Sequence, residues 1–164
     1  MNKATHAGYS YSASKPRARR GDDVIAEAVT ILERRLRRSG EIISNPSDIS
    51  RWLQLNIGHL EREVFWAIWL NNRHRVVGYE ELFSGTISGA SVHPREVVKS
   101  AMRHNAAACI LAHNHPSGDP EPSQSDRQIT LRLRDALALV DVRCLDHLVV
   151  GFPDVTSLAE RGLL

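Results

Sequence analysis

The chain has 164 residues, of which 42% are hydrophobic and 24% are charged, and its formal net charge is +2. This length is typical of one domain, and the composition is ordinary for a globular protein. No apolar run reaches the roughly 20 residues that a membrane-spanning helix needs, so we exclude a membrane-embedded protein and expect a cytoplasmic one.

The positive charge is concentrated at the N-terminus. Residues 1–20 contain five basic residues and no acidic one, so the other 144 residues sum to −3. Residues 1–21 lack an apolar pattern, and we interpret them as a disordered, solvated basic tail. Any contact with nucleic acid would therefore depend on this tail and not on the folded body.

Residues 22–44 are predicted to form an N-terminal helical unit. Apolar residues recur there at helical spacing, arginines gather towards the end, and Gly40 provides the stop. A second helix is predicted from Asn45 and Pro46, an N-cap followed by proline at the first helical position, to about Leu55.

The middle of the chain predicts a β-hairpin. Residues 64–70 are aromatic and β-branched, which is typical of a buried strand. Residues 71–74 have the composition of a turn, and residues 75–83 return as the partner strand.

Helices and strands alternate in the second half. The expected elements are a helix over 95–104, a buried strand over 106–112, a helix opened by Ser123, a strand over 142–150 and a short helix over 157–161. Together with the hairpin they predict a mixed α/β sandwich without a second domain.

Two histidines end the predicted buried strand. His113 and His115 point to the same side because strand side chains alternate, so both imidazoles can reach one metal ion. Asp126, in the first turn of the next helix, can offer a third ligand, and such a set leaves a fourth position for water, as in catalytic zinc sites. The alternatives are an incidental histidine pair and a capping box between Ser123 and Asp126. The combination favours the metal site.

These residues carry a resemblance to a known family. His113-x-His115 followed by Ser123-x-x-Asp126 resembles the JAMM motif of the JAB/MPN domain family. The chain resembles the bacterial RadC-like branch of this family over more of its length, in the stretches EELFSG (80–85), VHPREV (92–97), NAAA (105–108), AHNHPSG (112–118) and LDHLVVG (145–151). The resemblance covers about residues 45–164. It implies a JAB/MPN-like sandwich, in which a mixed, partly antiparallel sheet has flanking helices in cytidine-deaminase-like layers.

The resemblance also implies the roles of individual residues. It places the Zn²⁺ ligands of a metallopeptidase on His113, His115 and Asp126, and a serine that supports the oxyanion on Ser123. A glutamate on an early element acts as general base in the family, and Glu63 matches that position. Glu61 is the alternative. Longer RadC-like proteins add a helix-hairpin-helix module, which nothing in residues 1–44 resembles, so a short stand-alone form is expected.

The remaining histidines and cysteines are interpreted as structural. The histidines taken as surface, turn or capping residues are His59, His74, His93 and His104. Asp146 and His147 belong to the family-like pattern and are interpreted either as residues near the site or as a structural hydrogen-bonded pair, and they are left outside the ligand set. Cys109 and Cys144 are interpreted as buried free thiols, with a disulfide as the alternative.

Two functions follow as hypotheses. The first is a zinc-dependent hydrolase that cleaves a peptide or isopeptide bond in a peptide or protein substrate. The second is a DNA-repair or mobile-element accessory protein, in which the domain is a binding module and the metal is structural or vestigial. The presence of every motif residue favours the enzyme. The sequence indicates neither the identity of the substrate nor the oligomeric state.

Overall fold

The computed structural model describes residues 20–38, 46–85 and 92–164. The predicted basic tail, apart from its last two residues, lies outside these ranges, as does the predicted helix stop at Gly40. Among the described residues, no helix is both long enough and apolar enough to cross a membrane.

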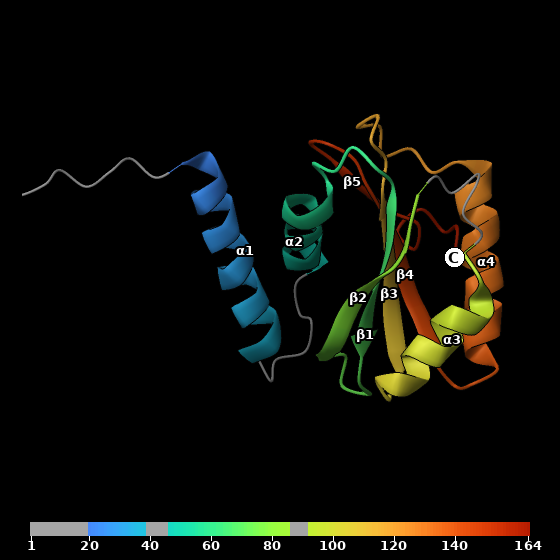
Figure 1. Cartoon of the computed structure of the whole chain (residues 1–164). Coiled ribbons are helices and arrows are strands. Elements are labelled where there is room, and N and C mark those ends of the chain that lie inside the picture. The colour runs from blue at the N-terminus through green and yellow to red at the C-terminus, as the bar shows by residue number, and fades with distance from the viewer. Residues whose placement is uncertain (1–19, 39–45, 86–91) are drawn as a thin grey trace, which may run out of the picture.

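The centre of the fold is a five-stranded mixed sheet in the order β2-β1-β3-β4-β5. Its strands are β1 Val64–Leu70, β2 Val76–Ser84, β3 Ala108–Asn114, β4 Arg143–Val150 and β5 Val155–Ser157. Strand β1 is antiparallel to both β2 and β3, strands β3 and β4 are parallel, and β5 is antiparallel to β4. Figure 1 shows helices on both sides of this sheet.

Within the described residues, four helices form the outer layers. The helices are α1 Gly21–Arg38, α2 Pro46–Ile57, α3 Pro94–Arg103 and α4 Gln124–Ala138. Helices α1 and α2 lie on one side of the sheet, and α3 and α4 lie on the other (Figure 1). The predicted mixed α/β sandwich with a partly antiparallel sheet is therefore confirmed.

Each face of the sheet has its own apolar core, because strand side chains alternate between the faces. On the α2 face, Ile49 and Trp52 of the helix pack with Ile68 and Ile110 of the sheet. The core on the α3/α4 face contains Phe65, Trp69, Leu111, Leu133 and Leu137. The two faces can thus carry two independent sites.

Helix α1 is only partly covered by the rest of the fold. It contacts α2 and the edge strand β2, where the hydroxyl of Tyr79 donates a hydrogen bond of 2.7 Å to Glu33. Val24 and Ile25 remain 51% and 45% exposed. The predicted helix is confirmed, but its apolar spacing overstates how much of it is buried.

The short helix predicted over 157–161 is wrong. Val155–Ser157 forms strand β5, and turns follow it. The physical reason is the free edge of β4: backbone groups of residues 155–157 pair with Leu148, Val149 and Val150, and unpaired backbone groups at a buried edge are costly.

A candidate metal centre at the end of β3

Three side chains converge where β3 ends. His113 is the penultimate residue of β3 and is fully buried. Its Nε2 atom lies 3.0 Å from Nε2 of His115 and 3.3 Å from Oδ1 of Asp126. His115 Nε2 lies 3.5 Å from Oδ2 of Asp126, which is buried in the first turn of α4. The three residues singled out by the sequence as ligands are thus brought together.

These separations fit a tetrahedral zinc ion. Zinc bonds to imidazole nitrogen and carboxylate oxygen are about 2.0–2.2 Å long, so two ligand atoms at a tetrahedral angle lie about 3.3 Å apart. The two Nε2 atoms lie 3.0 Å apart, and each lies near that distance from one carboxylate oxygen of Asp126, His113 at 3.3 Å from Oδ1 and His115 at 3.5 Å from Oδ2. The donor set and its spacing therefore suit zinc.

The loop after β3 determines the tautomer of His115. The Nδ1 atom of His115 lies 2.7 Å from the carbonyl oxygen of Asp119, and a carbonyl only accepts, so Nδ1 carries the proton. Gly118, at a φ of 82°, turns the chain to allow this contact. Gly151 packs so closely on the Gly118 carbonyl that a Cβ could not fit there. The Nε2 atom of His115 consequently presents a lone pair.

A buried hydrogen-bond chain determines the tautomer of His113. Thr130 donates its hydroxyl proton to the Asp126 carbonyl, so the Thr130 oxygen must accept from Nδ1 of His147. Nε2 of His147 is then an acceptor, and it receives the proton of His113 Nδ1 at 2.8 Å. His113 Nε2 therefore also presents a lone pair to the centre. Such outer hydrogen bonds typically orient metal-binding histidines.

The electrostatics of the cluster agree with a cation at this point. In the metal-free site a proton on Nε2 of His113 or His115 takes the place of the metal. Burial opposes ionisation of Asp126, but hydrogen bonds from these protonated imidazoles hold the pKa of its carboxyl well below the ordinary value. The hydrogen bond with Asp126 raises the pKa of His115. Burial, together with the charge at His113, lowers the pKa of His147 well below its ordinary value, so His147 stays neutral. Protons and a metal would compete for the same atoms, and metal affinity should fall as the pH falls.

Glu63 lies beside the two imidazoles. Glu63, His113 and His115 each offer one ligand atom, and these atoms lie within 4.8 Å of one another. Pairing of Phe65 with His113 in the β1–β3 ladder brings the start of β1 to this place. Glu61 is exposed and is not part of the group. The geometry thus prefers Glu63 to Glu61, and the role of Glu63 as general base stays a prediction.

Ser123 is the N-cap of α4. Its Oγ atom accepts the backbone N–H of Asp126 at 3.1 Å, and Asp126 Oδ2 accepts the backbone N–H of Ser123 at 2.7 Å. This is the capping box that the sequence offered as an alternative to metal binding. The capping box and metal binding by Asp126 are compatible, because Oδ1 of Asp126 still faces His113. The Ser123 hydroxyl keeps its own proton for donation, so its role at an oxyanion also stays a prediction.

Two supporting residues were not predicted as such. His147 and Thr130 hold His113 in place, whereas the sequence suggested a pair of Asp146 with His147. That pair is present, because the Asp146 carboxylate accepts the backbone N–H of His147. It also accepts the backbone N–H of Ala159 and the hydroxyl of Ser157. Thr130 could have been found, because it lies one helical turn after Asp126 on the same face of α4.

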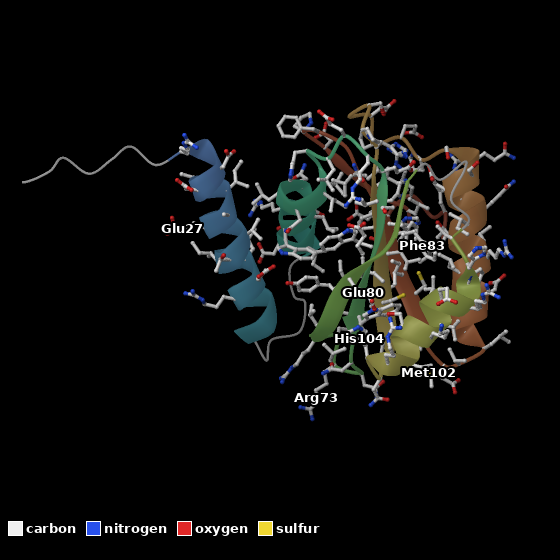
Figure 2. All side chains as sticks on the ribbon, in the orientation of Figure 1. Glu27, Arg73, Glu80, Phe83, Met102 and His104 are labelled. Carbon is white, nitrogen blue, oxygen red and sulfur yellow. The ribbon has the colours of Figure 1, made fainter. Side chains whose placement is uncertain are left out.

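The other histidines need two corrections. His93 is the N-cap residue of α3, but its side chain makes no capping hydrogen bond. His104 is not a surface residue: it is half-buried, stacks on Trp69 and donates from Nε2 to Glu80 at 3.1 Å. Figure 2 shows Glu80 and His104 near one another beside α3. The remaining interpretations agree with the structure, since His59 is exposed and His74 lies in the turn after β1.

Both cysteines are free thiols. Cys109 is buried and Cys144 is half-buried, and they lie at paired positions of β3 and β4. A hydrogen bond with Cys144, together with burial, raises the pKa of the Cys109 thiol well above its ordinary value. The prediction of unbridged thiols is confirmed.

Comparison with known proteins extends these observations. A model of the RadC-like JAB domain family matches residues 43–163. The chain is 62% identical over 125 residues to a UPF0758 protein of Thioalkalivibrio sulfidiphilus, which covers 76% of this chain and 56% of that protein. It is 57% identical over 133 residues to a UPF0758 protein of Nitrosococcus oceani, with 81% and 59% covered. For a UPF0758 protein of Vibrio cholerae the identity is 54% over 141 residues, with 86% and 88% covered.

The layered α/β fold, with its mixed sheet between two helical layers, is consistent with a JAB domain. Because the family model matches most of its length, the chain belongs to the RadC-like JAB domain family. The alignments span little more than half of the first two relatives, at 56% and 59% of their lengths.

Proposed function

We propose that the chain is a zinc-dependent hydrolase of the peptidase type, which cleaves a peptide or isopeptide bond. The convergence of His113, His115 and Asp126, with both imidazole lone pairs directed inward by hydrogen bonds, supports this function. Three protein ligands leave a fourth position open, which is the difference between a catalytic and a closed structural zinc site. Zinc bound there would lower the pKa of water towards about 7 and polarise a substrate carbonyl.

The residues around the three ligands supply the other parts of such a reaction. The half-buried Glu63 carboxylate takes the proton of the attacking water and returns it to the leaving nitrogen. The exposed Ser123 hydroxyl donates to the oxygen on which negative charge develops. Of the three ligands only the His115 side chain is appreciably exposed, at 18%, so the substrate approaches from that side.

The test uses the untagged full chain, loaded with zinc, and three variants. In Glu63→Gln, zinc content should remain near one per chain, while cleavage of a proteome-derived peptide library should fall at least about 100-fold. His115→Ala should lose zinc and cleavage together. Glu61→Gln is the matched control, because it removes an exposed carboxylate two residues away, and it should keep both. Elemental analysis gives the zinc content, and mass spectrometry of new peptide termini gives the cleavage rate.

Three results would each contradict one part of the proposed function. Zinc content near zero that added zinc cannot raise would contradict the ligand set. Full cleavage by Glu63→Gln would remove Glu63 from the mechanism. Zinc binding by the wild-type chain without any new peptide termini would reject the peptidase and leave a metal-binding domain.

A further inference from the structure

A second site lies on the face of the sheet opposite the metal centre. A cavity of about 260 Å³ opens between α2, the sheet and the turn that follows β5. Its floor and one side are aliphatic, formed by Ile49, Leu70, Ile110, Leu145, Leu148 and Val155. Ile110 and Leu148 belong to the α2-side core, whereas His113 and His147 project to the α3/α4 side. The cavity and the metal centre are therefore separate.

One wall of this cavity is polar and held in place by hydrogen bonds. Asp146, Ser157 and Glu160 line it. Asp146 Oδ1 accepts the backbone N–H groups of His147 and Ala159 at 2.7 and 3.0 Å, and Oδ2 accepts the Ser157 hydroxyl at 2.6 Å. The Ser157 oxygen in turn accepts the backbone N–H of Glu160 at 3.0 Å. These hydrogen bonds hold the side chains of Asp146 and Ser157 in place without a ligand, whereas the Glu160 carboxylate is exposed.

The two carboxylates of this wall have no cationic partner within the described ranges. Arg161, which follows Glu160, donates instead to Glu121 at 2.6 Å. Arg143, at the start of β4, donates to Nε2 of His74 at 3.0 Å. An acceptor nitrogen carries no proton, so His74 lines the cavity without a charge. The described lining therefore has two negative charges and no positive one.

We propose that this cavity binds a small organic cation, a primary ammonium group on an aromatic or branched aliphatic body. The aliphatic floor takes the body of the ligand, and the ammonium group donates to Asp146 and Glu160. Because 260 Å³ lies just below the roughly 300–1,000 Å³ of sites for drug-sized ligands, the ligand has about ten non-hydrogen atoms. The site needs no metal, so it does not depend on the proposed hydrolase.

The test uses three probes of similar shape and different charge: 2-phenylethylamine, 2-phenylethanol and phenylacetate. Each is titrated into the ¹⁵N-labelled full chain while backbone amide shifts are recorded. The amine should bind with a dissociation constant on the order of 1 mM or below. The shifts should centre on Ile110, Asp146 and Ser157. The alcohol should bind at least about tenfold more weakly, because it forms no charge-assisted hydrogen bond. Phenylacetate should not bind.

Variants separate the roles of the lining residues. Glu160→Gln, at an exposed position, should weaken amine binding about two- to fivefold and leave the alcohol unchanged. Asp146→Asn should weaken it at least about tenfold. Asp135→Asn is the matched control on the opposite layer and should have no effect. Binding should persist in His115→Ala, which removes a residue of the metal centre.

Several results would overturn the proposal. These are phenylacetate binding as tightly as the amine, shifts centred on the α3/α4 side, or no amine binding at about 10 mM. Unchanged affinity in both carboxylate variants would overturn it as well. If Asp146→Asn does not fold, the affinity of Glu160→Gln alone tests the proposal, because the Glu160 side chain is exposed and makes no contact on which the fold depends.

Discussion

His147 holds His113 through a direct hydrogen bond, in which Nε2 of His147 lies 2.8 Å from Nδ1 of His113. Both rings are fully buried. The contact joins neighbouring parallel strands, since His113 belongs to β3 and His147 to β4. Thr130 continues the chain of hydrogen bonds to the carbonyl of Asp126. Two of the three candidate zinc ligands are therefore joined by a path that does not pass through the metal.

Replacing Thr130 with Val should weaken zinc binding without removing any ligand. The change leaves His147 Nδ1–H without its acceptor, so the ring no longer holds a single orientation. Loss of an outer partner typically costs 10- to 100-fold in metal affinity, and we expect about tenfold here. Competition with a chromophoric chelator measures the affinity. Thr156→Val, a buried threonine of β5, is the control and should bind zinc normally. Equal zinc affinities in the two variants would contradict the proposal that the hydrogen bonds through Thr130 and His147 orient His113.

Asn114 holds the backbone on both sides of Glu63. Its Oδ1 atom accepts the N–H of Val64 at 2.8 Å, and its Nδ2 atom donates to the carbonyls of Leu60 and Arg62 at 3.2 and 3.1 Å. Asn114→Ala should lower the free energy of unfolding by about 2–4 kcal/mol, because buried backbone groups lose their partners. Urea unfolding measures this loss.

The same Asn114→Ala variant should keep its zinc and lose much of its hydrolysis. The three ligand side chains do not contact Asn114, whereas the position of Glu63 depends on it. Zinc content and cleavage rate are therefore compared on one folded preparation. Loss of zinc in parallel with cleavage would instead place the effect of Asn114 on the ligands.

Glu80 should make the stability of the fold depend on pH. Burial opposes its ionisation, but hydrogen bonds from Ser100 and Trp69 and the charges of Arg103 and His104 lower the pKa of its carboxyl below the ordinary value. A carboxyl whose pKa is lower in the folded state stabilises the protein above its unfolded-state pKa. That contribution is lost as the pH falls through the folded-state pKa.

The comparison of wild type with Glu80→Gln measures this contribution. At pH 7 the wild type should be more stable by about 1–3 kcal/mol, the range for hydrogen bonds to a charged group. The difference should begin to shrink below about pH 4, where the carboxyl of the unfolded chain becomes protonated, and it should disappear only below the lowered folded-state pKa. Urea unfolding in the presence of a chelator removes the contribution of zinc. A difference that does not change between pH 7 and 3.5 would contradict the role of the Glu80 charge.

The elements with strong local patterns were predictable from the sequence. The strand over 64–70 has the same bounds in the structure, and the capping box at Ser123 is present as predicted. Strand β5 was missed because its three residues are specified by the free edge of β4, whose paired residues lie five to nine positions earlier in the chain and leave no local pattern. The spacing of apolar residues in α1 likewise could not predict how much of that helix is buried.

The candidate ligands were predictable because they lie close together in the sequence. The residues that hold them by hydrogen bonds were not predictable. His113 and His115 alternate on one strand, and Asp126 follows at the start of the next helix. The contact of His147 with His113 depends on the parallel pairing of β3 with β4, which brings together residues 34 positions apart. His104 was taken for a surface residue because its partner Glu80 lies on β2, 24 positions earlier.

Removing residues 1–19 should abolish any binding of nucleic acid and leave the folded domain intact. The deletion removes four basic residues and no acid, which changes the formal net charge from +2 to −2. It should stop before Arg20, because the Arg20 carbonyl accepts the first N–H groups of α1 from Asp23 and Val24. The free energy of unfolding should change by no more than about 0.5 kcal/mol. Binding to a fluorescent DNA duplex is measured at several salt concentrations, since contacts between basic residues and phosphates weaken as salt rises. If the full chain binds DNA and the shortened chain binds equally well, with the same salt dependence, the contact surface lies on the folded domain and not on the tail.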